Sequence, residues 1–179
     1  MRAVRLTLVC HALTQAQKQG YLAQPNDCIV PVSGDPLALP QGTQLLAAPE
    51  RRTVQTATWL GESVHIEPAL ADGALGHWQG LPLKQVQAEQ PEALAQWLAD
   101  PLCAPPDGEP FVQVCERVGA WLSAFDRPGQ WWAVTHPWVI RAALVSVLEC
   151  PMVSAQHIDV MPLSQLALSR AGRWRFRLG

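Results

Sequence analysis

The sequence carries little charge of either sign and contains no long apolar run. Its 179 residues include 13 Lys and Arg against 15 Asp and Glu, a net charge of −2. This balance excludes an overall basic field, so we expect neither nucleic acid nor a membrane surface as partner. An anionic ligand would have to be held locally, by placed arginines or backbone amides. No stretch of eighteen apolar residues is present, which argues against a membrane span, and the run 6–10 is too short for a signal peptide.

The five cysteines show no pattern of disulfides or metal ligands. Their number is odd and no C-x-x-C pair occurs, which argues against a disulfide framework and against a zinc knuckle. We therefore expect reduced thiols in a cytoplasmic protein. No cluster of His, Cys, Asp and Glu suggests a metal site, so we expect neither a metal nor another cofactor.

Apolar residues make up 49% of the chain, and their spacing alternates between the strand and helix periods. Strands are expected in the run from Val4 to Val9, in 43–49, 63–69 and 131–135, with one or two more in 157–178. Helices are expected over 13–19, 50–61, 91–100, 111–125 and 137–149, and 70–91 is expected to be mostly loop. This alternation predicts an α/β fold, a three-layer sandwich with a central, mostly parallel sheet and helices on both faces.

Two histidines directly follow predicted strands. His11 ends the apolar run that begins at Val4, and His136 follows the strand 131–135. Because ligands of open α/β sheets bind at the carboxyl ends of the strands, we expect both imidazoles at the functional edge of the sheet. A lone histidine at a strand end is more often structural, so this placement needs support from other residues.

Four stretches, taken in order along the chain, supply that support: "LVCHALT" from residue 8, "APERRTVQTA" from residue 48, Asp72 followed by "GHWQG", and "VTHPWVIR" from residue 134. Together they resemble the motifs L-V-R-H-G-x-T, S-P-L-x-R-A-x-Q-T-A, an acidic residue before G-x-W-E-G, and V-x-H-G-x-x-I-R. These are the motifs of the histidine phosphatase superfamily, the phosphoglycerate-mutase-like group. Each match alone is weak, whereas four in the same order are specific. The resemblance implies a single histidine-phosphatase-like domain over 1–179.

The resemblance also implies catalytic roles for four residues. His11 would attack phosphorus and form a phosphohistidine, which requires a neutral imidazole held in one orientation. Arg52 and a protonated His136 would bind the phosphoryl oxygens, to which an arginine fork is well suited. Asp72 stands where the family has glutamate and would protonate the leaving alkoxide, directly or through water. As a residue on its own, Asp72 could equally be a plain loop carboxylate.

Four further residues are candidate substrate contacts. Gln17 stands where the family has asparagine, and Lys18 lies where its ammonium group could approach the phosphate. Arg51 is either a solvated helix residue or a secondary contact. Trp78, like Trp138, flanks the predicted site and is either core or an apolar wall for the substrate.

Cys10 is the main departure from the family pattern, which has arginine there. Loss of that phosphate clamp is worth ~10²–10³ in rate. A cysteine nucleophile would need an arginine six residues later, where Ala16 stands, so we expect Cys10 to be a small apolar residue that ends the strand. If Cys10 occupies the clamp position, Cys10→Arg should tighten phosphate binding, and less so if Lys18 already reaches the phosphate. Ala12 and Pro137, where the family has glycine, are further departures.

The sequence thus predicts a phosphomonoester phosphatase that acts through phosphohistidine on a small phosphorylated substrate. A mutase is less consistent with so short a chain. Altered residues around the pocket leave a second hypothesis open: a family member with impaired catalysis that binds a phosphorylated ligand or another protein. The sequence does not determine the substrate or the oligomeric state, a homodimer included.

Overall fold

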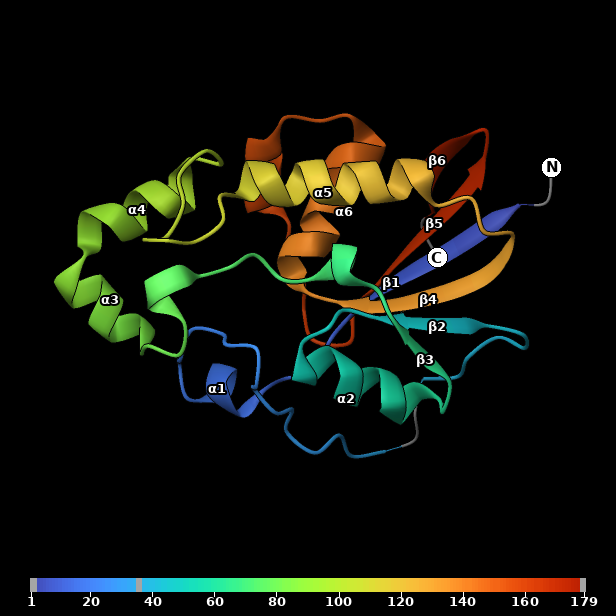
Figure 1. Ribbon diagram of the computed structural model, residues 1–179, viewed down its shortest axis with the longest axis horizontal. Helices are drawn as coiled ribbons and strands as arrows, with labels where there is room; N and C mark the ends of the chain where they lie inside the picture. The colour runs from blue at the N-terminus through green and yellow to red at the C-terminus, as the bar shows by residue number, and fades with distance from the viewer. Residues whose placement is uncertain (1–2, 35–36, 178–179) are drawn as a thin grey trace.

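The computed structural model describes residues 3–34 and 37–177 (Figure 1). Six strands form one sheet in the order β3-β2-β4-β1-β5-β6. The strands are β1 (Val4–Cys10), β2 (Gln44–Ala47), β3 (Val64–Ile66), β4 (Gly129–Thr135), β5 (Gln165–Ala171) and β6 (Arg173–Arg177). The first four are parallel to one another, whereas β5 pairs antiparallel with both β1 and β6. The predicted α/β class with a mostly parallel sheet is confirmed.

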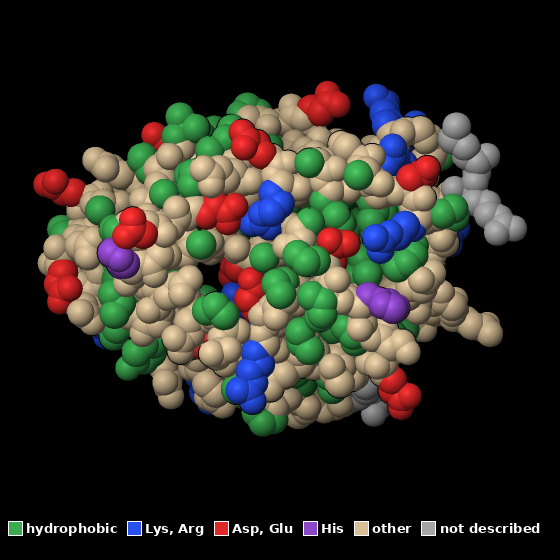
Figure 2. Space-filling view, viewed as in Figure 1, with side chains coloured by type: hydrophobic (Ala, Val, Ile, Leu, Met, Phe, Trp, Pro, Cys, Tyr) green, Lys and Arg blue, Asp and Glu red, His purple; other side chains and the backbone are tan. Residues whose placement is uncertain are grey.

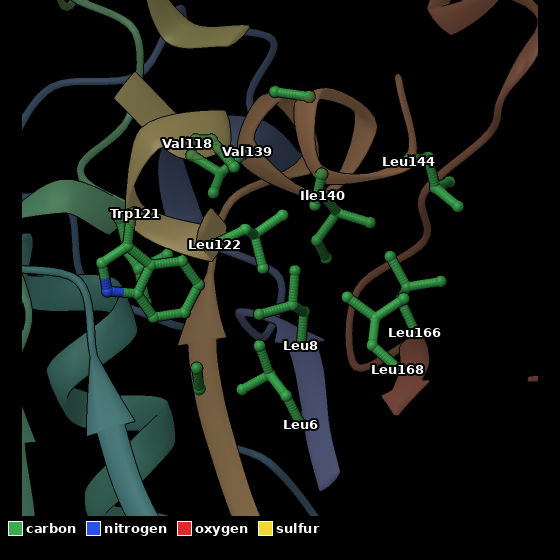
Figure 3. Packing of buried hydrophobic residues seen from close by; sticks show 14 of the residues in the cluster. Leu6, Leu8, Val118, Trp121, Leu122, Val139, Ile140, Leu144, Leu166 and Leu168 are labelled. Carbon is green, nitrogen blue, oxygen red and sulfur yellow. The ribbon is translucent and has the colours of Figure 1, made fainter. Parts of the chain in front are cut away.

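Helices cover both faces of this sheet (Figure 1). The helices α5 (Phe111–Ala124) and α6 (Pro137–Leu148) lie on one face, and α2 (Arg51–Leu60) lies on the other. Alternation along β1 explains this division, because successive side chains of a strand point to opposite faces. Leu6 and Leu8 pack with Leu122 and Ile140 of the α5/α6 layer (Figure 3), whereas Val9 packs with the α2 layer.

The remaining helices are short. They are α1 (Gln15–Lys18), α3 (Leu83–Glu89), α4 (Pro91–Ala99) and the 3₁₀ segments η1 (Pro68–Leu70), η2 (Gly76–Trp78) and η3 (Met152–His157). Both α3 and α4 lie beyond the carboxyl ends of the parallel strands (Figure 1). No helix of the described residues has the length and apolarity needed to cross a membrane.

The prediction that 70–91 is mostly loop is wrong for the residues of α3. The first part of that segment contains Gly73, Gly76 and Gly80, and the helix begins directly after Pro82. Only Val86 of α3 is buried, so the helix lacks the apolar period by which sequence analysis finds helices. Val86 instead packs in a small cluster with Trp78 and Leu94, which is a tertiary contact. The helix predicted over 13–19 is also shorter than expected and is followed by Gly20 at φ +77°.

Candidate active site

Both histidines lie at the carboxyl edge of the sheet. Cys10 and Thr135 are paired in register on the neighbouring strands β1 and β4, so the next residue of each strand leaves the sheet at the same place. The backbone N–H of His11 donates to the carbonyl of Thr135 at 2.9 Å. The centroids of the His11 and His136 rings are 5.3 Å apart, in an edge-on arrangement. The parallel pairing of β1 and β4 is therefore what brings these two imidazoles together.

His11 is held as a neutral ring with one nitrogen available. Its Nδ1 lies 2.8 Å from the carbonyl oxygen of Ala12, and since a carbonyl only accepts, Nδ1 carries the proton. The lone pair is then on Nε2. Burial, followed by the neighbouring charge of His136, lowers the pKa of His11 from 6.5 to about 4. The imidazole is therefore unprotonated at neutral pH, as a nucleophile must be.

Arg52 and Asp72 form an ion pair beside the histidines. Nη2 of Arg52 lies 2.6 Å from Oδ2 of Asp72, and Nη1 donates to the carbonyl of Gln24 at 2.9 Å. The arginine is only 2% exposed, and its Nε has no hydrogen-bond partner among the residues that the structure describes. A buried guanidinium with a free N–H is a group that can bind an anion.

Glu50 is a site residue that the sequence analysis missed. Its Oε2 lies 2.8 Å from Nε2 of His136, and its Oε1 accepts the backbone N–H of Asp72 at 3.0 Å. Burial alone would raise the pKa of Glu50, but the hydrogen bond and the charge of His136 outweigh burial and lower the pKa to about 2. Glu50 stands where the motif has leucine. A charged residue at this apolar position of the motif could have indicated that Glu50 belongs to the site.

Two carboxylates, Glu50 and Asp72, flank the ring of His136. Nδ1 of His136 lies 3.4 Å from Oδ2 of Asp72, a charge contact without hydrogen-bond geometry. His136 therefore lies between two carboxylates, and Arg52 faces one of them. A phosphoryl group has to compete with Glu50 and Asp72 for these donors.

Cys10 does not contribute a group to the pocket. Its side chain is 1% exposed and belongs to the apolar cluster beneath α5 and α6. Burial raises the pKa of its thiol to about 12, which excludes a thiolate nucleophile at neutral pH. The prediction of a small apolar residue at the strand end agrees with this packing. That an arginine at this position would reach the phosphate stays a prediction, since the thiol packs in the core cluster while the charges of Asp72 and Arg52 act on it.

A pocket of about 220 Å³ opens onto His11 and Asp72. The face seen in Figure 2 is hollowed close to the segment between η1 and η2, and acidic side chains lie at the edge of this hollow. Gln17 lines the pocket, and its side chain also closes the capping box of α1 with Thr14. Trp97 and Trp138 form the aromatic wall.

Arg52 and His136 are buried next to Asp72 and do not line this pocket, and neither do three of the predicted substrate contacts. Lys18 is exposed at the end of α1, and Arg51 is exposed with its backbone N–H bonded to the carbonyl of Pro25. Trp78 is fully enclosed, donates its Nε1 hydrogen to Gln90, and belongs to the cluster that joins η2 to α3 and α4. The interpretation of Trp78 as a substrate wall is therefore wrong, because a helix absent from the prediction covers it.

Comparison with known proteins agrees with the resemblance found in the motifs. The profile of the histidine phosphatase superfamily (branch 1) matches residues 34–178, a range that begins after His11. A glucosyl-3-phosphoglycerate phosphatase of Mycobacterium tuberculosis (strain H37Rv) is 31% identical over 129 residues. The corresponding protein of Mycolicibacterium vanbaalenii is 30% identical over the same length. Each alignment covers 65% of this chain and only 58% and 57% of the relative.

Solved structures match over nearly the whole chain, the first motif included. A protein described as mycobacterial hydrolase 1 superposes with a TM-score of 0.78 at 25% identity, covering 99% of this chain and 98% of that one. A mycobacterial glucosyl-3-phosphoglycerate phosphatase in complex with VO3 gives 0.80 at 24% identity, covering 100% and 99%. The α-ribazole phosphatase of Shigella flexneri gives 0.80 at 22% identity, covering 97% and 95%. The last two establish a shared fold.

Proposed function

Since the chain belongs to the histidine phosphatase superfamily, we propose that it is a phosphomonoester phosphatase that works through a phosphohistidine at His11. One observation carries the proposal. His11 is buried and neutral, with Nδ1–H donated to the carbonyl of Ala12 and Nε2 left as a nucleophile, and it lines the pocket together with Asp72. A residue kept only for packing would not need this fixed tautomer.

In the first step, Nε2 of His11 attacks phosphorus, the N–P bond forms, and the bond from phosphorus to the ester oxygen breaks. Arg52, which pairs with the pocket-lining Asp72, stabilises the charge that spreads over the phosphoryl oxygens. We assign the proton donor for the leaving alkoxide to Asp72: when the phosphoryl oxygens take over Arg52, the carboxylate of Asp72 loses its counter-charge, binds a proton from solvent and passes it to the alkoxide. In the second step, water gives a proton to the carboxylate of Asp72 and attacks phosphorus, the N–P bond breaks, inorganic phosphate leaves, and Nε2 of His11 is restored.

A second function, ligand binding with little turnover, is favoured by three observations around the site. Cys10 faces the core, Lys18 lies outside the pocket, and Glu50 adds a carboxylate next to His136. Cys10 itself supplies no cation where the first motif of the family has arginine. We therefore expect slow hydrolysis, lower by ~10²–10³ than a site that retains this clamp.

We propose a small phosphorylated molecule as the substrate. The names of the mycobacterial relatives make a glycosylated phosphoglycerate the first compound to test. The five cysteines are free thiols in the structure, which supports the proposed cytoplasmic location. The chemistry above requires neither a metal nor another cofactor.

The test is hydrolysis of an activated aryl phosphate in the presence of a chelator. His11→Ala is expected to abolish turnover because it removes the nucleophile. The exposed His65 offers a matched control, and His65→Ala should retain wild-type turnover. If His11→Ala and the wild-type protein hydrolyse the ester at the same rate, the phosphatase proposal is wrong and ligand binding remains.

A further inference from the structure

A second pocket, of about 260 Å³, lies between α4, the first turn of α5, the first turns of α6, and η3. Its walls are mainly apolar, with Trp97, Phe111, Trp138 and Met152 among them. Among the residues that the structure describes, Arg141 is the single charged one that lines it. The phosphatase mechanism assigns no role to this pocket, although Arg141 is the last residue of the fourth motif.

Arg141 is half-buried and has no anionic partner. Its Nε donates to the carbonyl of Ile158 at 2.8 Å, which fixes the direction of the guanidinium. Within the described ranges no carboxylate lies within 4.0 Å of it, and Asp159 acts on its charge only from farther away. Burial lowers the pKa of Arg141, which reflects the lost hydration of the cation. A partly desolvated guanidinium on an apolar wall is stabilised when an anion binds it.

The aromatic rings form a preorganised wall for a flat ligand. Trp97 and Trp138 are stacked with ring centroids 5.1 Å apart and planes at 20°. Phe111 meets Trp138 edge-on at 5.3 Å. Since each ring is fixed by another, little side-chain entropy is lost when a planar group packs against them. The lining therefore suits an apolar ring that carries one negative charge.

The same two tryptophans connect this pocket to the catalytic one. Trp97 and Trp138 line both pockets, and Trp138 is only two residues from His136. A ligand that shifts this stacked pair also changes the wall of the pocket at His11. Coupling between the two pockets thus needs no other moving element.

We propose that this second pocket binds a small planar apolar anion, such as an aromatic carboxylate, through Arg141, and that its occupancy changes anion binding at His11. The binding claim is independent of turnover. A protein that hydrolyses nothing but binds such an anion through Arg141 would refute the proposed function and leave this inference intact.

The test is calorimetric titration with 2-naphthoate and with its uncharged analogue 2-naphthamide. We expect Arg141→Met to weaken naphthoate binding by about 10-fold or more and to leave naphthamide binding unchanged, because only the charge-assisted contact is lost. Arg5→Met, at an exposed arginine of β1, is the matched control and should bind naphthoate like the wild-type protein. Met152→Trp, which fills the pocket while Arg141 stays, should weaken binding of both compounds.

Coupling is measured by titrating inorganic phosphate with and without saturating naphthoate. We expect the dissociation constant of phosphate to change by about 5-fold or more, the lower range of site-to-site coupling. Naphthoate affinity that is unchanged in both Arg141→Met and Met152→Trp would overturn the assignment. Complete displacement of naphthoate by phosphate would also overturn it, since naphthoate would then occupy the catalytic pocket. A phosphate affinity that does not respond to naphthoate would overturn the coupling.

Discussion

Glu50 holds Nε2 of His136 at 2.8 Å, although 86 positions separate the two residues in the chain. The same carboxylate accepts the backbone N–H of Asp72, so it ties the loop after η1 to the histidine after β4. Glu50 occupies a donor that a phosphoryl oxygen would otherwise use. The site is therefore organised before a ligand binds, but the ligand has to compete with Glu50 for the N–H of His136.

Glu50→Gln should strengthen anion binding. The amide keeps an oxygen acceptor for His136 and removes the negative charge, so inhibition by phosphate or vanadate should tighten by about 10-fold, equivalent to ~1.4 kcal/mol. The measurement is the inhibition constant with an aryl phosphate substrate. Glu62→Gln, at an exposed carboxylate, should change nothing. Weaker inhibition in Glu50→Gln would mean that Glu50 orients His136 more than it competes with the ligand.

His11 should titrate near pH 4 in the folded protein, where burial and the charge of His136 place its pKa. Its neutral form is the nucleophile, so kcat/KM should fall on the acid side near pH 4 rather than near 6.5. The unfolded chain binds this proton more readily, so the contribution of His11 to stability is lost as pH falls from 6.5 through about 4. NMR titration of the His11 ring measures the pKa directly. A value at or above 6.5 would contradict the neutral nucleophile.

Asp72→Asn should affect poor leaving groups more than good ones. An alkyl phosphate needs a proton on its leaving oxygen, whereas an activated aryl phosphate hardly does. We expect turnover of the alkyl ester to fall by ~10²-fold or more and turnover of the aryl ester to fall far less. Asp126→Asn, at an exposed position, is the control. Equal losses for the two esters would assign Asp72 to positioning Arg52 instead.

Cys10 should matter for stability and little for catalysis. Cys10→Ala is expected to keep turnover within about two-fold of wild type, because the thiol lies in the core and does not line the pocket. Cys10→Arg forces a large cation into packed apolar surroundings, which costs ~1–3 kcal/mol or more and lowers the melting temperature. Thermal unfolding and turnover of both variants test this. A Cys10→Arg protein of wild-type stability with tighter phosphate binding would restore the clamp interpretation.

Much of the fold and the four motif positions could be predicted from the sequence, because they depend on local patterns. His11 and His136 each follow an apolar run that predicts a strand. Because these strands are parallel, their carboxyl ends lie at one edge of the sheet. The helix α3 could not be predicted in this way, since its burial rests on Val86 alone. The contact between Glu50 and His136 was equally inaccessible, because β2 must pair with β4 before the two residues meet. Trp78 was misplaced for a related reason, since α3 and α4 cover it.

The central claim is a covalent phosphoryl group on His11, and trapping it is the most direct measurement. The protein is mixed with an aryl phosphate, quenched in alkali within a turnover, digested, and analysed by mass spectrometry. We predict a phosphoryl adduct on His11 that survives alkali and is lost in acid, as expected of an N–P bond, and that is absent from His11→Ala. Turnover with no adduct on His11, or an adduct on another residue, would contradict the account.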